Sequence, residues 1–290
     1  MTVARRVLLA GLLGAAVWLS AGSASARRSS SAGLDVRPNV IVEAALGDVD
    51  IEVEATSANR VEIVDASLPS GFTAKVSGSA RRIEVELEGI GVPGSGKVKL
   101  SVPKGARLEV HTRNGDVTVH DLQGEADVVV VQGDIAIDGS PEHVEASTTS
   151  GDIRVVGVRE DAELATVSGD VSVSGMKGKL EVGAVSGNIT VSSSALERSE
   201  LAVVSGTIDV QADLGAGSHE FAAHSGNISV RVGAKQGARF RVETFSGTIE
   251  DALLDPPVTA RGRHLREIGD GSARVDVATF SGNVRLGRAK

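Results

Sequence analysis

The chain contains no cysteine and no tyrosine, and aromatic residues make up only 2% of its 290 residues. Without cysteine it can form no disulfide and carries no site for lipid attachment through a thiol. Its one tryptophan, Trp18, lies in a segment that we expect to be removed, which leaves five phenylalanines in the mature chain. Carbohydrate and nucleic-acid sites usually rely on aromatic stacking, so this scarcity argues against both classes.

The first 26 residues have the pattern of a secretory signal. Arg5 and Arg6 form a charged start, residues 7–20 form an apolar stretch, and Ala24-Ser25-Ala26 is a small-residue cleavage motif. We therefore predict cleavage after Ala26 and export to the periplasm, the cell surface or the medium. A membrane anchor is the alternative, but the apolar run is short of the roughly 20 residues that a spanning helix needs. No second hydrophobic segment follows, so we expect no stable transmembrane anchor after cleavage.

The chain is short of positive charge. Its formal net charge is −8, and removal of residues 1–26, which hold two arginines and no acid, leaves 28 Lys and Arg against 38 Asp and Glu, a net charge of −10. A negative surface repels phosphate groups, so it argues against binding to nucleic acid and to anionic lipid headgroups. Val, Ile and Gly are abundant and long helical periodicities are missing, which is typical of an all-β protein.

A short motif is repeated along the chain: a glycine, usually after Ser, is followed by Asp, Asn or Thr and then by Ile or Val. Successive glycines are 18, 18, 18, 18, 19, 20, 21 and 35 residues apart, the last interval being close to two repeats. A fixed short period indicates one small unit stacked on copies of itself, which favours a scaffold or binding surface over a single pocket. We expect the repeat glycines to be structural turn residues. They are Gly115, Gly133, Gly151, Gly169, Gly187, Gly206, Gly226, Gly247 and Gly282.

Apolar residues alternate on both sides of each repeat glycine. The residue two positions after the glycine is Val or Ile in nine of nine copies, and the residue five positions before it is apolar in every copy. Such alternation predicts strands with one buried face, so each unit is interpreted as strand, turn, strand and looser connection. The sequence thus predicts a single-stranded β-solenoid with rungs of 18–21 residues. A twisted antiparallel β-sandwich is the alternative.

The residue after the glycine is Asp, Asn or Thr in every copy. These side chains share a short oxygen acceptor that can bond nearby backbone amides, which indicates turn chemistry around a glycine at positive φ. The alternative is a calcium ladder built from Asp116, Asp134, Asp152 and Asp170. Because the later copies lose the charge, we predict no bound metal.

The position two residues before the glycine holds a second apolar set, on the side of the strand opposite to the buried one. Either another layer covers this side or it forms an exposed stripe for a partner or for self-association. The stripe is defined by Val131, Val167, Val185 and Val204. The lengthening of the repeat falls within residues 192–200, 211–219 and 231–239, which we expect to be variable binding loops or tolerated surface insertions.

The domain organisation follows from these patterns. Residues 27–39, rich in Ser and Arg, are expected to be a flexible linker, and residues 40–290 a single β-solenoid domain. Within it, 40–110 is an irregular N-terminal β part and 111–250 holds the regular repeats. The closing part, 251–290, is interrupted by a Pro-Pro pair and a basic stretch that indicate a loop or a capping excursion.

Three motifs suggest a phosphate-binding loop, a metal site or a catalytic serine, but each lacks residues that the function requires. The segment from Gly91 to Lys97 approaches a phosphate-binding loop, but no Ser or Thr follows Lys97 and a strand pattern replaces the required helix. The six histidines show no metal-ligand spacing, and the repeated serines lack a paired His and acid at consistent offsets. We predict no catalytic residue, no cofactor and no metal.

Taken together, three features resemble the bacterial "putative adhesin" family of β-strand-repeat domains of unknown function. These are the Ser-Gly-Asp-Ile motifs, the lead-in from Val98 to His111, and Gly269-Asp270-Gly271 ahead of residues 279–282. The resemblance covers residues 40–288. It implies a β-solenoid that is exported or associated with the envelope, and it supplies no catalytic residues.

The sequence therefore favours a non-enzymatic exported scaffold, an adhesion-type or envelope binding module of a bacterium. Its partner would be a protein or another envelope component, or a second copy through self-association. A domain for envelope stress or regulatory interaction is the first alternative. A β-helix polysaccharide lyase or hydrolase is the second, but no rung carries the cluster of acids and bases that this chemistry requires.

Overall fold

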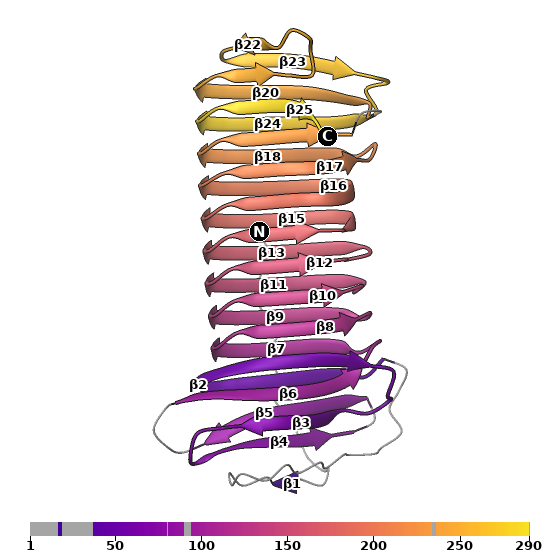
Figure 1. The fold of residues 1–290 in the computed structure, drawn as a ribbon, viewed down its shortest axis with the longest axis vertical. Helices are drawn as coiled ribbons and strands as arrows, with labels where there is room; N and C mark the ends of the chain where they lie inside the picture. Colours follow the sequence, from indigo (N-terminus) through magenta and orange to yellow (C-terminus); the bar gives the residue numbers. More distant parts are fainter. Residues whose placement is uncertain (1–16, 19–36, 80, 90–93, 234–235, 290) are drawn as a thin grey trace.

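The computed structural model describes residues 17–18, 37–79, 81–89, 94–233 and 236–289. The described residues include no helix, and hence none that is long and apolar enough to span a membrane. The predicted cleavage site after Ala26 and most of the predicted linker lie outside them. The strands form one elongated stack, with β4 near one end and β22 near the other (Figure 1).

Each rung consists of two strands joined at the repeat glycine. The strands before the glycine form what we call the first face. They are β7 (Arg107–Asn114), β9 (Glu125–Gln132), β11 (His143–Ser150), β13 (Asp161–Ser168), β15 (Lys177–Ser186), the second half of β16 (Ile189–Ser205), β18 (Ser218–Ser225), β20 (Ala238–Ser246) and β24 (Ala273–Ser281). The strands after it form the second face. They are β8 (Val117–Leu122), β10 (Ile135–Gly139), β12 (Ile153–Val156), β14 (Val171–Ser174), the first half of β16, β17 (Ile208–Leu214), β19 (Ile228–Val232), β21 (Ile249–Asp251) and β25 (Val284–Arg288).

Neighbouring rungs pair in parallel and in register. On the first face Ala146 lies opposite Val128 on one side and Leu164 on the other, and on the second face Ile153 lies between Ile135 and Val171. Equivalent residues of the repeat therefore form columns along the stack. The predicted β-solenoid is confirmed, and the antiparallel sandwich is wrong because the repeat strands pair in parallel.

The first rung in the sequence is not the first in space. Strand β2 (Asn39–Thr56) forms a whole rung that lies between β5 (Arg82–Gly89) with β6 (Ser95–Pro103) on one side and β7 with β8 on the other. Beyond β5 and β6, the strands β4 (Phe72–Gly78) and β3 (Glu62–Ser67) pair with them antiparallel. The short strand β1 (Val17–Trp18) pairs antiparallel with β4.

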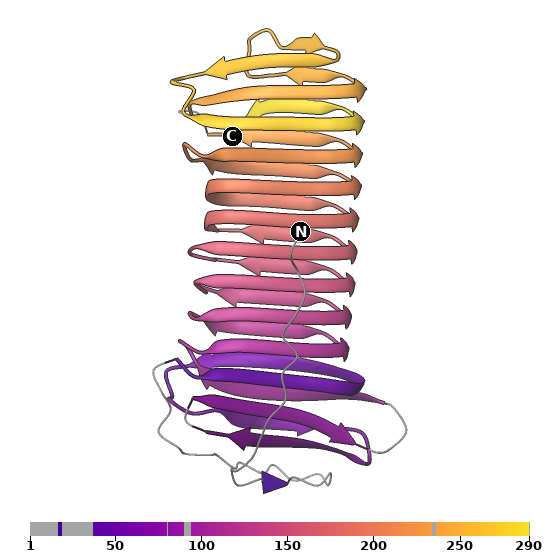
Figure 2. The same cartoon turned by 180° about the vertical axis from the view of Figure 1, so that it is seen from behind.

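The C-terminal end repeats this arrangement. Strands β24 and β25, the last in the chain, lie between the rung of β18 and β19 and the rung of β20 and β21 (Figure 1, Figure 2). Strands β23 (Arg263–Ile268) and β22 (Val258–Ala260) pair antiparallel with β20 and β21. The long interval before Gly282 thus holds an antiparallel cap, and the chain then returns to fill the gap that it left one rung earlier.

The core lies between the two faces. The buried apolar residues form one continuous cluster along the stack, from Val40 to Leu286. Burial of each Val, Leu, Ile or Phe side chain stabilises the fold by about 1.5–3 kcal/mol. Because every rung contributes the same inward positions, stability grows with each rung added and each rung depends on its neighbours.

The repeat glycines stack directly on one another. A Cβ atom on Gly169 would collide with the backbone carbonyl oxygen of Gly151, and each of the other eight repeat glycines meets an equivalent carbonyl in an adjacent rung. Positive φ is found at seven of the nine, including +150° at Gly169, whereas Gly226 and Gly247 lie outside that range. Close approach between rungs, more than the turn conformation, therefore requires glycine in this column.

The residue after the glycine links rungs and does not bond within its own turn, which corrects the sequence interpretation. Oδ1 of Asp134 accepts a hydrogen bond from the backbone N–H of Asp152 at 2.8 Å, and Oδ1 of Asp152 accepts one from Asp170 at 2.7 Å. At the C-terminal end the ladder runs from Asn227 to Asn283 and then to Thr248. It follows the order of the rungs in space. Asp and Asn both serve because each supplies a side-chain oxygen that accepts the next backbone N–H, and Asn188 additionally donates from Nδ2 to Oδ1 of Asp170 at 3.0 Å.

The segments predicted as variable loops are partly strands. Residues 192–200 lie within β16, where Ser193 has φ +49° and the pairing with β17 shifts between Ser192 and Ser194. The extra residue of this repeat is therefore absorbed as a bulge, which lets the flanking strand residues keep their inward and outward directions.

His219 is a buried polar residue of the core. Its Nδ1 lies 2.9 Å from Oγ of Ser199, and its Nε2 lies 3.1 Å from the carbonyl oxygen of Gly215. Burial lowers the pKa of His219, and the hydrogen bond to Gly215 opposes that shift only in part. The neutral ring satisfies both contacts when Nε2–H donates to Gly215 and Nδ1 accepts from the Ser199 hydroxyl.

We expect acid to destabilise the fold through His219. In the unfolded chain an imidazole takes up a proton as the pH falls through about 6.5, whereas the buried ring does so only at lower pH. The unfolded state then binds more protons, so the free energy of unfolding decreases as the pH falls below that value. The Ser199→Ala, His219→Leu double variant should lack this component. Denaturant unfolding at about pH 7.5 and 5.5 measures it, and an equal loss in both proteins would contradict the role of His219.

Candidate binding surface

The apolar stripe predicted from the sequence is exposed on the first face. Val131, Val167, Val185 and Val204 have exposed fractions of 45%, 49%, 48% and 50%. No layer of the described residues covers them. Thr149 holds the equivalent place in β11, so the stripe tolerates a β-branched polar residue. Strand alternation explains the exposure, because the residue before each stripe residue, such as Thr166 or Ala184, points inward and is buried.

The stripe ends in stacked rings. His224 and Phe280 stack with ring centroids 5.2 Å apart, and Phe280 stacks on Phe245 at 4.8 Å, each pair with an interplanar angle of 6°. This ladder exists only because the last rung is inserted, which places Phe280 between the other two rings. Phe245 is 80% exposed and Phe280 51% exposed. Large apolar rings left in water on a rigid face are typical of an interaction site.

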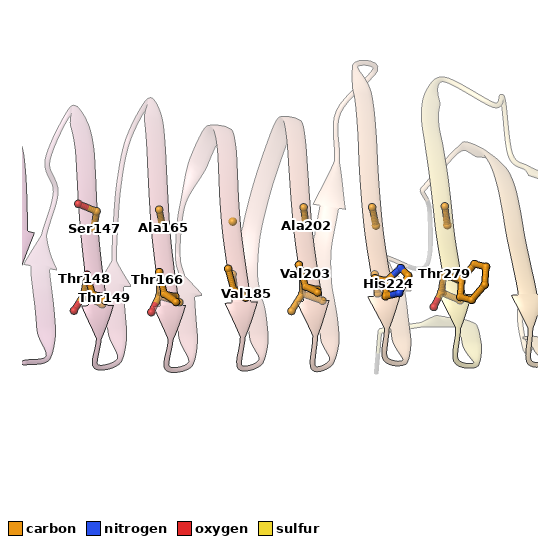
Figure 3. A pocket seen from close by; sticks show the side chains of 18 of the residues that line it. Ser147, Thr148, Thr149, Ala165, Thr166, Val185, Ala202, Val203, His224 and Thr279 are labelled. Atoms are coloured by element: carbon orange, nitrogen blue, oxygen red, sulfur yellow. The ribbon is translucent and has the colours of Figure 1, made fainter. Parts of the chain in front are cut away.

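Beside the stripe runs a row of small side chains. Ser147 and Ala165 lie side by side in neighbouring strands, and Ala202 lies two strands beyond Ala165, all further from the turns than Thr149, Val185 and His224 (Figure 3). Gly183 holds the equivalent place in β15. Small residues between larger ones leave a groove of about 1400 Å³, lined mainly by Val, Ala, Thr and Gly. The groove runs along the stack and across the strands.

The small residues Ser147, Ala165, Gly183 and Ala202 form the floor of the groove. Buried threonine hydroxyls on the first face hydrogen-bond to neighbouring rungs. Thr148 Oγ1 donates to the carbonyl oxygen of Gly133 at 3.2 Å, and Thr279 Oγ1 donates to that of Gly226 at 3.0 Å. These hydroxyls point inward under the floor and are buried. Because their bonds run to an adjacent rung, they fix the strands that carry the stripe and limit side-chain rearrangement there.

The cap closes the C-terminal end of the groove. Gly262 and Arg263 line it there. Arg263 Nε lies 2.9 Å from Oε1 of Glu243, and the backbone N–H of Thr244 donates to the carbonyl oxygen of Gly262 at 2.8 Å. The groove is therefore bounded at this end by a short turn of the chain.

A polar cluster that the sequence analysis missed attaches the cap. Asp251 occupies an inward core position and is 1% exposed at its side chain, with Oδ2 3.0 Å from Nε2 of His264 and 3.5 Å from Nε of Arg266. In eight other copies this position is apolar. The replacement of an apolar residue by Asp251 at this position was the feature of the sequence that could have indicated the cluster. The contacts suit a structural role, since both partners come from the strand that covers the outermost rung.

The remaining candidate motifs have structural roles. Gly96 and Lys97 lie in strand β6, paired with β2, where a phosphate-binding loop would need a helix N-terminus. Lys97 and Lys99 hydrogen-bond Glu52 and lower the pKa of its carboxyl to about 2. Across the part of the chain that the structure describes, no three His, Asp or Glu side chains are grouped so that they could hold a metal ion.

The Toastrack DUF4097 family model matches residues 37–162 and again residues 140–287. No curated protein matches the chain. Among solved structures, it is similar to a putative adhesin from Bacteroides fragilis, with 10% identity over 92% of this chain and 99% of that one and a TM-score of 0.41. It is also similar to a putative cell adhesion protein from Clostridium sporogenes, with 8% identity over 91% and 99% and a TM-score of 0.19. Because the family model matches most of its length, the chain belongs to the Toastrack DUF4097 family.

Proposed function

We propose that this protein is an exported, non-enzymatic β-repeat module of a bacterial envelope that binds a partner through the groove of the first face. The observation that carries the proposal is the line of half-exposed valines, interrupted by Thr149, that continues into the stacked rings. Exposed apolar area in a connected line gains free energy when a partner removes it from water. A repeat scaffold offers such a surface over its whole length.

The lining of the groove supports binding over catalysis. General acid–base chemistry needs positioned groups that exchange protons near neutral pH. Along β9 to β16 the groove is lined by Val, Ala, Ser, Thr and Gly, and ionisable side chains occur only at its C-terminal end, at His224, Glu243 and Arg263. Most positions of the two columns, the stripe and the row of small side chains, hold small or apolar residues, which suits a surface whose contribution is spread over many rungs.

We expect the Val167→Thr, Val185→Thr variant to associate more weakly than the parent protein. Threonine keeps β-propensity and already occupies the stripe at Thr149, while it removes apolar contact. Circular dichroism should show an unchanged fold, and light scattering and pull-down from an envelope fraction should show weaker association. Val64→Thr, at a site 50% exposed outside the groove, is the matched control. Association that is equally strong in all three proteins would refute the groove as the binding surface.

A further inference from the structure

A row of unpaired acids runs beside the groove. Six positions before the repeat glycine, five consecutive rungs carry an exposed glutamate that makes no ion pair with any described residue. They are Glu145, Glu163, Glu181, Glu200 and Glu220. Two other acids at this position, near the ends of the stack, are paired, Glu109 with Arg107 at 3.4 Å and Asp276 with Arg241 at 3.7 Å. Lys179 and Arg198 line the same hollow as Glu163, Glu181 and Glu200 without forming an ion pair with them, so the five glutamates outnumber the cations beside them.

The acid row, the floor and the stripe share the first face. In each of the five rungs that carry a row glutamate, the glutamate, the small floor residue and the stripe residue are two positions apart, so all three point outward. The glutamate and the stripe residue are thus about 13 Å apart along a strand. This separation accommodates an α-helix, whose diameter with side chains is about 10–12 Å.

We propose that the groove binds a basic amphipathic α-helix of a partner protein, lying along the stack, an inference that rests on the proposed function. Its apolar side chains would contact the stripe and the small floor residues, and its Lys or Arg side chains would face the acid row. Rungs repeat every 4.8 Å or so, close to the roughly 5.4 Å pitch of a helix, so successive turns meet successive rungs. The eight rungs from β9 to β20 span about 34 Å, the length of roughly 22 helical residues.

Backbone chemistry favours a helix over an extended segment. The first face presents side chains, because its backbone N–H and C=O groups are used between rungs. An extended peptide laid across these strands would find no backbone partners, whereas a helix satisfies its own. Charge favours a basic partner over a second copy of this chain. A second copy would bring five more unpaired glutamates to the interface without a matching row of cations.

The test uses a synthetic 22-residue helical peptide with Leu at i, i+3, i+4 and i+7 and Lys on both flanks, labelled for fluorescence anisotropy against the full mature chain. The Glu163→Gln, Glu181→Gln, Glu200→Gln variant should raise the Kd about tenfold and flatten its dependence on salt. The Asp138→Asn, Glu197→Gln, Asp213→Asn variant removes the same charge from exposed sites outside the groove and should leave the Kd unchanged. A peptide with Glu in place of Lys should not bind.

Two results would overturn the inference. One is equal affinity of the two charge variants, and the other is equal binding of the Lys and Glu peptides. If the peptide fails to bind while the stripe variant abolishes a dimer seen by light scattering, the occupant is a second copy and the proposed function stands. If the stripe variant alters neither peptide binding nor association, the proposed function fails as well.

Discussion

The Ser225→Cys, Ser281→Cys double variant is expected to form an intramolecular disulfide on oxidation, whereas the Ser225→Cys, Ser246→Cys variant is expected to keep two free thiols. Ser281 lies directly opposite Ser225 on one side and Ser246 on the other. Neighbouring strands are about 4.8 Å apart. That distance falls within the Cα separation of about 4.4–6.8 Å that a disulfide allows, while two rungs, about 9.6 Å, exceed it.

Because the parent chain has no cysteine, the only thiols in each variant are the two that are introduced. Thiol titration and mobility on a non-reducing gel report the bridge directly, and Ser246→Cys with Ser281→Cys provides a second pair that should close. A stack that followed the order of the sequence would give the opposite result, with bridges between positions 225 and 246. That outcome would refute the inserted rung and, with it, the stacking of His224, Phe280 and Phe245 in that order.

The order of the rungs could not be read from the sequence, for a physical reason. Every copy of the repeat presents the same inward Val and Ile positions and the same glycine, so any rung can stack on any other. The periodic pattern predicts the structure of a single rung, but it does not predict which rung lies next to it in the stack. The long interval before Gly282 and the Pro-Pro pair indicated an interruption. Only the paired strands show that the chain returns between two earlier rungs.

Within a rung the sequence was informative. Alternation placed Val182 and Ile189 inside and Val185 outside, and the structure has them so. This prediction succeeds because the direction of a side chain in a strand is set locally, by parity. Whether another layer covers the outer side is a long-range question, and the sequence analysis left it open. The acid row follows from the same parity, because a residue six positions before the glycine points outward like the residue two positions before it, but the pattern of apolar positions alone does not reveal it.

The column of repeat glycines also combines a local effect within a rung with a contact between rungs. A turn at positive φ accounts for Gly169, but it does not account for Gly226 and Gly247, which lack that conformation. Their glycine is required by the carbonyl of an adjacent rung, a contact between residues far apart in the chain. The repeated glycine correctly indicated that no side chain fits at this position, but the reason is a contact with the neighbouring rung. The Asp and Asn ladder is a second case, since its hydrogen bonds also join successive rungs.

Gly169→Val is expected to destabilise the protein by about 2–6 kcal/mol. A β-branched residue at φ +150° carries a backbone cost of about 1–3 kcal/mol. The collision of its Cβ with the carbonyl oxygen of Gly151 adds about 1–3 kcal/mol, as overpacking does in a tight core. The neighbouring rung is backbone at this point, so it cannot move aside as a flexible side chain would. Denaturant unfolding followed by circular dichroism measures the loss.

Two control variants separate the collision from other effects. At Gly183, in the groove floor, a Cβ meets no atom within 4 Å, so Gly183→Val should be neutral or stabilise by about 0.5–1 kcal/mol, because valine favours a strand more than glycine does. Asp170→Asn should be close to neutral, since the amide oxygen can accept the Asn188 N–H that Asp170 now accepts at 2.7 Å. Equal losses at Gly169 and Gly183 would show that the cost belongs to glycine in strands generally. A large loss from Asp170→Asn, especially with calcium raising the parent's midpoint, would show that the charge of the Asp column matters and would contradict the ladder as the reason for this residue.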